Sequence, residues 1–199
     1  MTRIGLFGGT FDPPHLGHMI LAAEAFHSLS LDRIFWILTP QSPLKDERTI
    51  SSVQQRRELV LAALQNVPEF ELSQVDILRE PPYYAVDTVK ILKREYPGTD
   101  FVYLMGGDSL RDLPAWHDPN QFVQELSGLG VYRRPGSQPD LEILEKLCPG
   151  IKTKTTIFQA PQIEISAADI RQRIREGRPF RFFLPPEVYQ LICAQNLYR

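Results

Sequence analysis

Cysteine is scarce in this chain: Cys148 and Cys193 are the two cysteines among 199 residues. They stand far apart, with no C-x-x-C pair and no histidine cluster, so the sequence indicates neither a disulfide framework nor a structural zinc site. Long apolar runs are also lacking, and no segment approaches the length that spans a membrane. A signal peptide is not evident either, because the opening Met1–Arg3 leads directly into a strand pattern. We therefore expect a reduced, cytoplasmic setting.

An excess of charge of either sign is absent as well. The chain has 22 Lys and Arg against 24 Asp and Glu, a formal net charge of −2. Because positive and negative charges are nearly equal in number, the sequence favours neither a general nucleic-acid partner nor a membrane-surface partner. A composition of 43% hydrophobic and 23% charged residues is typical of a globular protein. We expect a single domain over residues 1–199, of which about 165–199 form a helical C-terminal cap.

Short apolar segments alternate with helical patterns along the chain. The strand patterns are Ile4–Phe7, Ile34–Leu38, Phe101–Met105 and Leu129–Tyr132, with weaker ones at Phe70–Ile77 and Thr156–Phe158. The helical patterns are Met19–Leu29, Val53–Leu64, Val86–Tyr96, Pro119–Leu126, Leu141–Leu147, Ala167–Arg175 and about Pro186–Gln195. This alternation predicts an α/β fold, a doubly wound (Rossmann-like) parallel sheet flanked by helices. Such sheets bind ligands beyond the carboxyl ends of their strands.

The most informative segment is Gly8–His18, GGTFDPPHLGH, between the first strand pattern and the first helical pattern. We expect a turn at Gly8 and Gly9, because two glycines let a main chain approach an anion closely. The following helix would offer unpaired N–H groups and a positive dipole end. His15 and His18 would project from one face of its first turn. The alternative is a tight turn with two helix-capping histidines.

This segment resembles the nucleotidyltransferase signature, in which G-x-F-D-P is followed by H-x-G-H. It is most similar to the opening of the bacterial nicotinate-nucleotide adenylyltransferases. Near the other end, Ile165–Arg171, ISAADIR, resembles the second signature of the superfamily, I-S-S-T-x-I-R, with alanine at 167 and 168 in place of Ser and Thr. The resemblance implies transfer of AMP from ATP to nicotinate mononucleotide, which gives deamido-NAD and pyrophosphate.

For ATP, the resemblance implies catalytic roles for His15, His18 and Arg171. The ATP-binding residues that we expect are Gly8, Gly9, Thr10, Phe11, His15, His18, Gly106, Asp108, Ser166 and Arg171. Two of them have structural alternatives: Ser166 with Asp169 fits a helix capping box, and Asp108 fits a helix N-cap. For Asp12 we favour a structural role, accepting from main-chain N–H groups near the turn.

For the mononucleotide, the residues that we expect are Lys45, Tyr84, Ala85, Trp116 and Arg134, with Arg57 as a weaker candidate. Lys45 lies on a proline-rich loop and is otherwise a plain surface lysine. Tyr84 and Ala85 stand where the family has S-Y-T-x-D-T, so the missing hydroxyl of Ala85 leaves the preference for acid or amide open. Trp116 either stacks on the pyridine ring or covers the core.

The reaction needs no side-chain nucleophile, because a phosphomonoester is already largely dianionic near neutral pH. The sequence has no convincing Ser-His-Asp or Cys-His arrangement, which fits a direct in-line displacement. Mg²⁺ would accompany ATP, held by its phosphates and by water, with no protein metal site. The expected partners are ATP and nicotinate mononucleotide, without nucleic acid or membrane, and a homo-oligomer is left open.

Several other functions remain to be weighed. The nearest is an adenylyltransferase for nicotinamide mononucleotide, or for both mononucleotides. A nucleotide-sensing module without turnover would use the same crevice. A pantetheine-phosphate adenylyltransferase is less favoured, because that family has Thr where His15 stands. A class I aminoacyl-tRNA synthetase fragment lacks its K-M-S-K-S-like run here, and an oxidoreductase lacks G-x-G-x-x-G.

Overall fold

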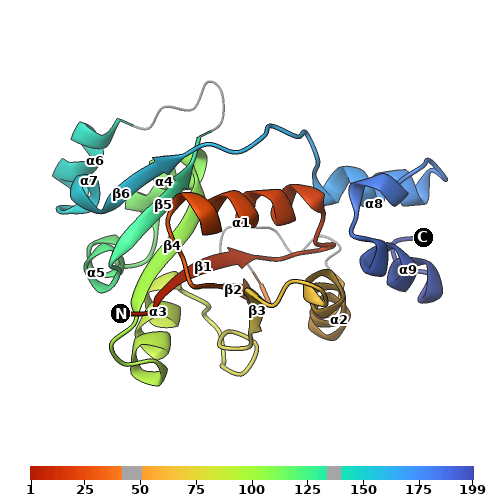
Figure 1. The fold of residues 1–199 in the computed structure, drawn as a ribbon, viewed down its shortest axis with the longest axis horizontal. Helices are drawn as coiled ribbons and strands as arrows, with labels where there is room; N and C mark the ends of the chain where they lie inside the picture. The colour runs from red at the N-terminus through yellow and green to blue at the C-terminus, as the bar shows by residue number, and fades with distance from the viewer. Residues whose placement is uncertain (42–50, 134–139) are drawn as a thin grey trace.

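A computed structural model describes residues 1–41, 51–133 and 140–199 of the chain. In this part, one parallel sheet runs through the molecule with the strand order β3-β2-β1-β4-β5-β6 (Figure 1). The strands are β1 (Arg3–Gly9), β2 (Arg33–Leu38), β3 (Phe70–Ser73), β4 (Asp100–Gly106), β5 (Gly128–Tyr132) and β6 (Thr155–Phe158). The predicted doubly wound α/β fold is confirmed.

The direction of winding reverses at β1. Phe7 of β1 lies opposite Trp36 of β2 on one side and opposite Leu104 of β4 on the other. In an open parallel sheet, the point where the strand order reverses leaves a crevice beyond the carboxyl ends of the two strands. The loops that follow β1 and β4 therefore lie at the edge where sheets of this topology generally bind ligands.

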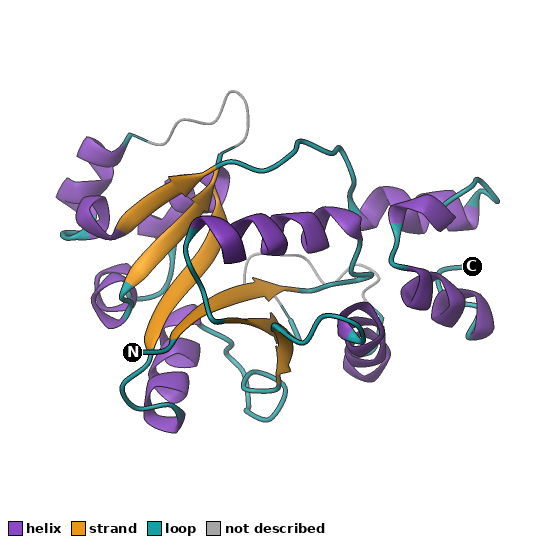
Figure 2. Ribbon diagram, in the orientation of Figure 1, coloured by secondary structure: helices purple, strands orange, loops and turns teal. Residues whose placement is uncertain are grey.

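Helices cover both faces of the sheet (Figure 2). They are α1 (Leu16–Ser28), α2 (Val53–Leu64), α3 (Ala85–Glu95), α4 (Gly107–Asp112), α5 (Pro119–Glu125), α6 (Leu141–Leu147), α7 (Ile151–Lys154), α8 (Ala167–Arg175) and α9 (Pro186–Ala194), with short 3₁₀ turns η1 (Leu113–Ala115) and η2 (Arg181–Phe183). One apolar cluster joins α1 and α2 to the sheet, through Ala25 and Val60, for example. The other joins α3, α5 and α6, through Val89, Phe122 and Leu144.

The C-terminal helices pack on α2 instead of on the sheet. Ile170 of α8 and Val188 and Ile192 of α9 form a third apolar cluster with Leu59 and Ala63 of α2. Figure 1 shows α8 and α9 at the opposite end of the molecule from α6 and α7. The expected helical cap is confirmed, while the division into a single domain stays a prediction. None of the described helices has the length and apolarity to cross a membrane.

The expected glycine turn is wrong in its position, because Gly8 and Gly9 are the last two residues of β1. A Cβ on Gly8 would lie 2.9 Å from the Tyr103 hydroxyl, and one on Gly9 would lie 2.9 Å from the ring of Phe11. The left-handed residue is Phe11 itself, with φ 46°. Close packing of two aromatic side chains therefore accounts for the glycine pair.

The third strand is shorter than its apolar pattern, ending at Ser73 instead of continuing to Ile77. The reason is Asp76, a buried carboxylate that accepts hydrogen bonds from the hydroxyl of Thr88 and the guanidinium of Arg79. A side chain paired in this way fixes the chain in a turn, because a buried carboxylate is costly unless it is hydrogen-bonded.

Candidate active site

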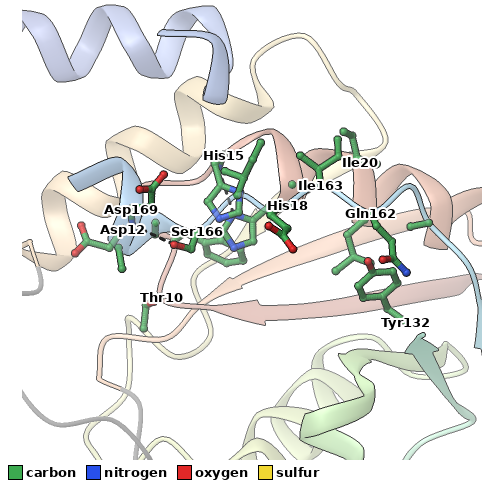
Figure 3. A pocket seen from close by; sticks show the side chains of 18 of the residues that line it. Thr10, Asp12, His15, His18, Ile20, Tyr132, Gln162, Ile163, Ser166 and Asp169 are labelled. Atoms are coloured by element: carbon green, nitrogen blue, oxygen red, sulfur yellow. Dashed lines mark hydrogen bonds between the residues drawn. The ribbon is translucent and has the colours of Figure 1, made fainter. Parts of the chain in front are cut away.

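A cavity of about 950 Å³ opens beyond the carboxyl end of β1 (Figure 3). Two segments far apart in the sequence supply most of its lining: residues 10–21, which run from the loop after β1 into α1, and residues 160–171, which lead into α8. Tyr132 at the end of β5 also lines it. The predicted site residues that line it are Thr10, Phe11, His15, His18, Ser166 and Arg171. The structure thus brings the two signature segments together around one space.

The remaining predicted residues lie elsewhere. Gly106 and Asp108 follow β4, and Tyr84, Ala85 and Trp116 pack against the core on the α3 side of the sheet. Lys45 and Arg134 lie outside the described residues. The N-cap alternative for Asp108 is wrong: α4 begins at Gly107, so its N-cap is Gly106 and Asp108 stands in its first turn.

His15 and His18 form a stacked pair at the start of α1. Their ring centroids are 3.7 Å apart, and the planes meet at 29°. The main-chain N–H of His15 donates to Nδ1 of His18 at 3.2 Å, so a neutral His18 carries its proton on Nε2. A Cβ on Gly17 would come within 3.0 Å of Nδ1 of His15. Glycine at this position therefore gives the first imidazole its room.

His15 is a buried imidazole with 6% of its surface exposed. Burial lowers its pKa to about 4, because the charged form loses hydration. Its Nδ1 has no hydrogen-bond partner within the described parts of the chain. At neutral pH this ring is uncharged, and it is suited to donate a hydrogen bond to a ligand oxygen from one nitrogen.

Ser166 is the N-cap of α8, which is half of the predicted capping box; no bond is described from the Ser166 main-chain N–H to the Asp169 side chain. Its hydroxyl oxygen accepts from the main-chain N–H of Asp169 at 3.1 Å. The Asp169 carboxylate accepts from Arg173 at 2.7 Å. Because Ser166 accepts in the cap, its hydroxyl hydrogen remains available to donate into the cavity.

Arg171 links α8 to the loop after β1. Its Nη1 donates to the main-chain carbonyl of Asp12 at 2.5 Å and lies 3.8 Å from the Asp12 carboxylate. Asp12 is 2% exposed, and its Oδ2 accepts from the main-chain N–H of Ser51. Asp12 therefore accepts from the main chain near the loop, which is the structural role that we expected.

Arg56 is a residue that the sequence analysis overlooked in favour of its neighbour Arg57. It is 1% exposed and donates to four main-chain carbonyls, those of Thr10, Thr39, Pro40 and Ser51. Burial lowers its pKa, and the nearby Asp12 opposes that effect. The signal was present in the sequence, because position 56 shares its helix face with the buried Leu59, Val60 and Ala63.

A second polar network holds the start of α3, where Tyr84 and Ala85 lie. Arg79 donates to the Tyr84 carbonyl at 3.2 Å and to Asp76 at 2.9 Å. Burial raises the pKa of Asp76, while the hydrogen bonds from Thr88 and Arg79 lower it. The Tyr84 ring stacks on His117 with centroids 3.9 Å apart. This network fixes the N-terminal end of α3.

Trp116 follows η1 and packs edge-on against Tyr103 and tilted against Phe122. It is partly buried against the α3 cluster, so it covers the core as one alternative predicted. Its buried Nε1 lacks a hydrogen-bond partner among the described residues. A buried indole N–H usually finds such a partner, so a ligand group is one way to satisfy it.

A known protein family and several curated relatives match most or all of this chain. The cytidylyltransferase-like family matches residues 6–173. A probable nicotinate-nucleotide adenylyltransferase of Thermomicrobium roseum is 42% identical over all of this chain and 92% of its own length. One of Exiguobacterium sibiricum is 40% identical over 98% of each chain. This chain belongs to the nicotinate-nucleotide adenylyltransferase family. It is accordingly a nucleotidyltransferase.

Solved structures agree on the fold. The nicotinic acid mononucleotide adenylyltransferase of Plasmodium falciparum, complexed with NaAD, superposes with a TM-score of 0.77 and 19% identity, covering 100% of this chain and 98% of its own. A putative nicotinate-nucleotide adenylyltransferase of Vibrio parahaemolyticus superposes with a TM-score of 0.66 and 20% identity, covering 100% of this chain and 96% of its own. This adenylyltransferase family member thus shares its fold with both solved structures over its full length.

The buried state of His15 leads to a pH-dependent stability. Between its folded pKa of about 4 and the ordinary value of 6.5, the unfolded chain binds a proton that the folded chain does not. Lowering the pH across this window therefore favours unfolding. We expect the unfolding free energy to fall by roughly 3 kcal/mol more in the wild type than in His15→Asn. Urea unfolding at several pH values measures it.

The control for this prediction is His27→Asn, which removes an exposed imidazole from the same helix. A pH profile that His15→Asn leaves unchanged would contradict a neutral, buried His15.

Arg56 and Arg57 offer a matched pair for testing the loop contacts. Arg56→Lys keeps the charge but loses the planar fork that reaches four carbonyls, so we expect a loss of at least about 2 kcal/mol in unfolding free energy. Arg57 bonds to Gln74 at 3.3 Å on the surface, so Arg57→Lys should change stability by less than about 0.5 kcal/mol. Chemical denaturation measures both. Equal losses would show that Arg56 does not hold the loop.

Proposed function

We propose that this protein transfers AMP from ATP to nicotinate mononucleotide, forming deamido-NAD and pyrophosphate. The observation that carries the proposal is the meeting of the two signature segments: Arg171 of α8 bonds to the Asp12 carbonyl beside the stacked His15 and His18. The names of the full-length relatives, and a structural neighbour complexed with NaAD, support this choice of substrate.

In this proposal the cavity receives the phosphates of ATP. His18 donates from Nε2 and His15 from its protonated nitrogen, at the positive end of the α1 dipole. The Ser166 hydroxyl, the N-terminus of α8 and Arg171 face the phosphates from the opposite wall. Fixed donors of this kind stabilise charge that develops on the α-phosphate and on the leaving pyrophosphate. The mononucleotide phosphate attacks directly, without a covalent intermediate.

The other predicted residues complete the two substrate sites in the proposal. Thr10 and Phe11, with Gly8 and Gly9 beneath them, frame the triphosphate, and the Gly106 and Asp108 turn receives the adenosine. The mononucleotide lies on the α3 side, with its ring on Trp116 and its carboxylate near the main chain of Tyr84 and Ala85. From the sequence alone, Lys45 is proposed for its phosphate, and Arg134 as a further residue that binds the mononucleotide.

Mg²⁺ belongs to the proposed reaction as a companion of ATP. Among the described residues, no group of three or more His, Cys, Asp or Glu side chains is placed to hold a metal ion. An ion carried by phosphates and water suits such a site, because Mg²⁺ dehydrates reluctantly and seldom uses an all-protein cage. Bound there, it would neutralise phosphate charge that His15, His18 and Arg171 also face.

Parallel kinetics with nicotinate and nicotinamide mononucleotides, each with ATP and Mg²⁺, test the proposal. We expect pyrophosphate and deamido-NAD, with a higher kcat/KM for the acid, because the N-terminus of α3 favours a negative group. In His18→Ala, kcat should fall by about 10²-fold or more, while the ATP dissociation constant changes little, since the donor acts mainly in the transition state.

The controls separate the alternatives. Preference for nicotinamide mononucleotide would correct the substrate. ATP binding without pyrophosphate release from the wild type would instead indicate a nucleotide-sensing module.

Trp116 provides a separate test of the mononucleotide site. If its indole stacks on the pyridine ring, Trp116→Ala should raise the KM for the mononucleotide by about tenfold, with a smaller effect on the KM for ATP. Steady-state kinetics with each substrate varied in turn measure both. Trp116→Phe is the matched control, because it keeps an aromatic face. Equal effects on both substrates would indicate that the indole only covers the core.

A further inference from the structure

Tyr198 connects the segment after α9 with the loop after β1. Its hydroxyl donates to Oδ1 of Asp12 at 2.7 Å, across 186 positions of the sequence. Burial and the neighbouring Asp12 carboxylate both raise the pKa of the Tyr198 phenol. The hydroxyl therefore stays protonated and continues to donate throughout the neutral pH range.

Asp12 gathers three segments through different atoms. Oδ1 accepts from Tyr198, Oδ2 accepts from the main chain of Ser51, and the main-chain carbonyl accepts from Arg171. The Asp12 side chain is 3% exposed. A buried carboxylate is held firmly by such bonds, since losing one leaves an uncompensated polar group. The position of the Asp12 carbonyl, and with it that of Arg171, depends on these contacts.

The chain after α9 is shaped to deliver this hydroxyl. Leu197 is buried in the cluster that contains Leu59 and Ile170, and its N–H bonds to the Ile192 carbonyl at 3.1 Å. Asn196 and Tyr198 flank it in the left-handed region, with φ 50° and 67°. Residues other than glycine rarely adopt this backbone conformation, so it persists only where surrounding contacts enforce it. Packing of the C-terminal helices therefore sets the direction of the Tyr198 side chain.

We propose that Tyr198 is a positioning residue of the ATP phosphate site. By fixing the Asp12 carboxylate, it holds the Asp12 carbonyl where that oxygen receives Arg171. It thereby keeps the guanidinium and the chain that leads to His15 in one geometry. In this proposal Tyr198 contacts neither the α-phosphorus of ATP nor the attacking oxygen of the mononucleotide phosphate. The kinetic consequence rests on the proposed adenylyl transfer, whereas the effect on ATP binding does not.

The test is Tyr198→Phe, which keeps the ring and removes only the donor. We expect kcat/KM for ATP to fall by about tenfold, the change expected from losing one hydrogen bond to a charged group. The ATP dissociation constant, from calorimetry without mononucleotide, should rise by at least about threefold by the same reasoning. The KM for the mononucleotide should stay within about twofold, because that substrate lies on the α3 side.

Tyr189→Phe is the matched control. It removes a hydroxyl from α9, where the Tyr189 ring packs on Phe180, and it leaves Asp12 untouched. Its kinetics and ATP affinity should match those of the wild type. Thermal midpoints of both variants show whether an effect comes from lost folding.

The outcomes separate the inference from the proposed function. If Tyr198→Phe lowers only the thermal midpoint, with ATP affinity and kcat/KM unchanged, the role is structural and the inference is overturned. If the wild type releases no pyrophosphate, the proposed function fails, and calorimetry alone decides the inference. Weaker ATP binding in Tyr198→Phe but not in Tyr189→Phe then supports it, and equal binding overturns it.

Discussion

The hydrogen bond from Arg171 to the Asp12 carbonyl is the contact on which the geometry of the site depends. It joins α8 to the loop after β1, two elements that are 159 positions apart in the sequence. The cavity keeps its two walls only while α8 stays in place, and α8 is held by apolar packing on α2 through Ile170 and Leu59. Burial of a few aliphatic side chains outside the cavity therefore controls the spacing of the polar groups that line it.

Around this contact, buried polar groups hold the loop after β1 in place. Arg56 donates to four main-chain carbonyls, Asp12 accepts from three other segments, and His15 is kept neutral by burial. Each would be costly alone, because a polar group removed from water needs a partner. Together they orient donors before a ligand arrives. Such preorganisation suits a reaction whose chemistry lies between two phosphates and needs only positioning and charge stabilisation.

A buried polar network also stabilises the other side of the sheet, where α3 begins. Asp76, Arg79 and Thr88 fix the start of α3, and Trp116 closes the core next to it. The reversal of strand order at β1 places the two proposed substrate sites at the carboxyl edge of one sheet. Topology alone thus brings together two polar regions, each built from its own local network.

The sequence by itself determined the alternation of strands and helices, the two signature segments and the cap of α8 by Ser166. These follow from residues a few positions apart, whose periodicity and hydrogen bonds are local. Tertiary structure alone decided that Gly8 and Gly9 end a strand, which main-chain carbonyls Arg56 reaches, and that Tyr198 reaches Asp12. Those contacts span up to 186 positions. Their existence depends on how helices pack on one another, which no local pattern specifies.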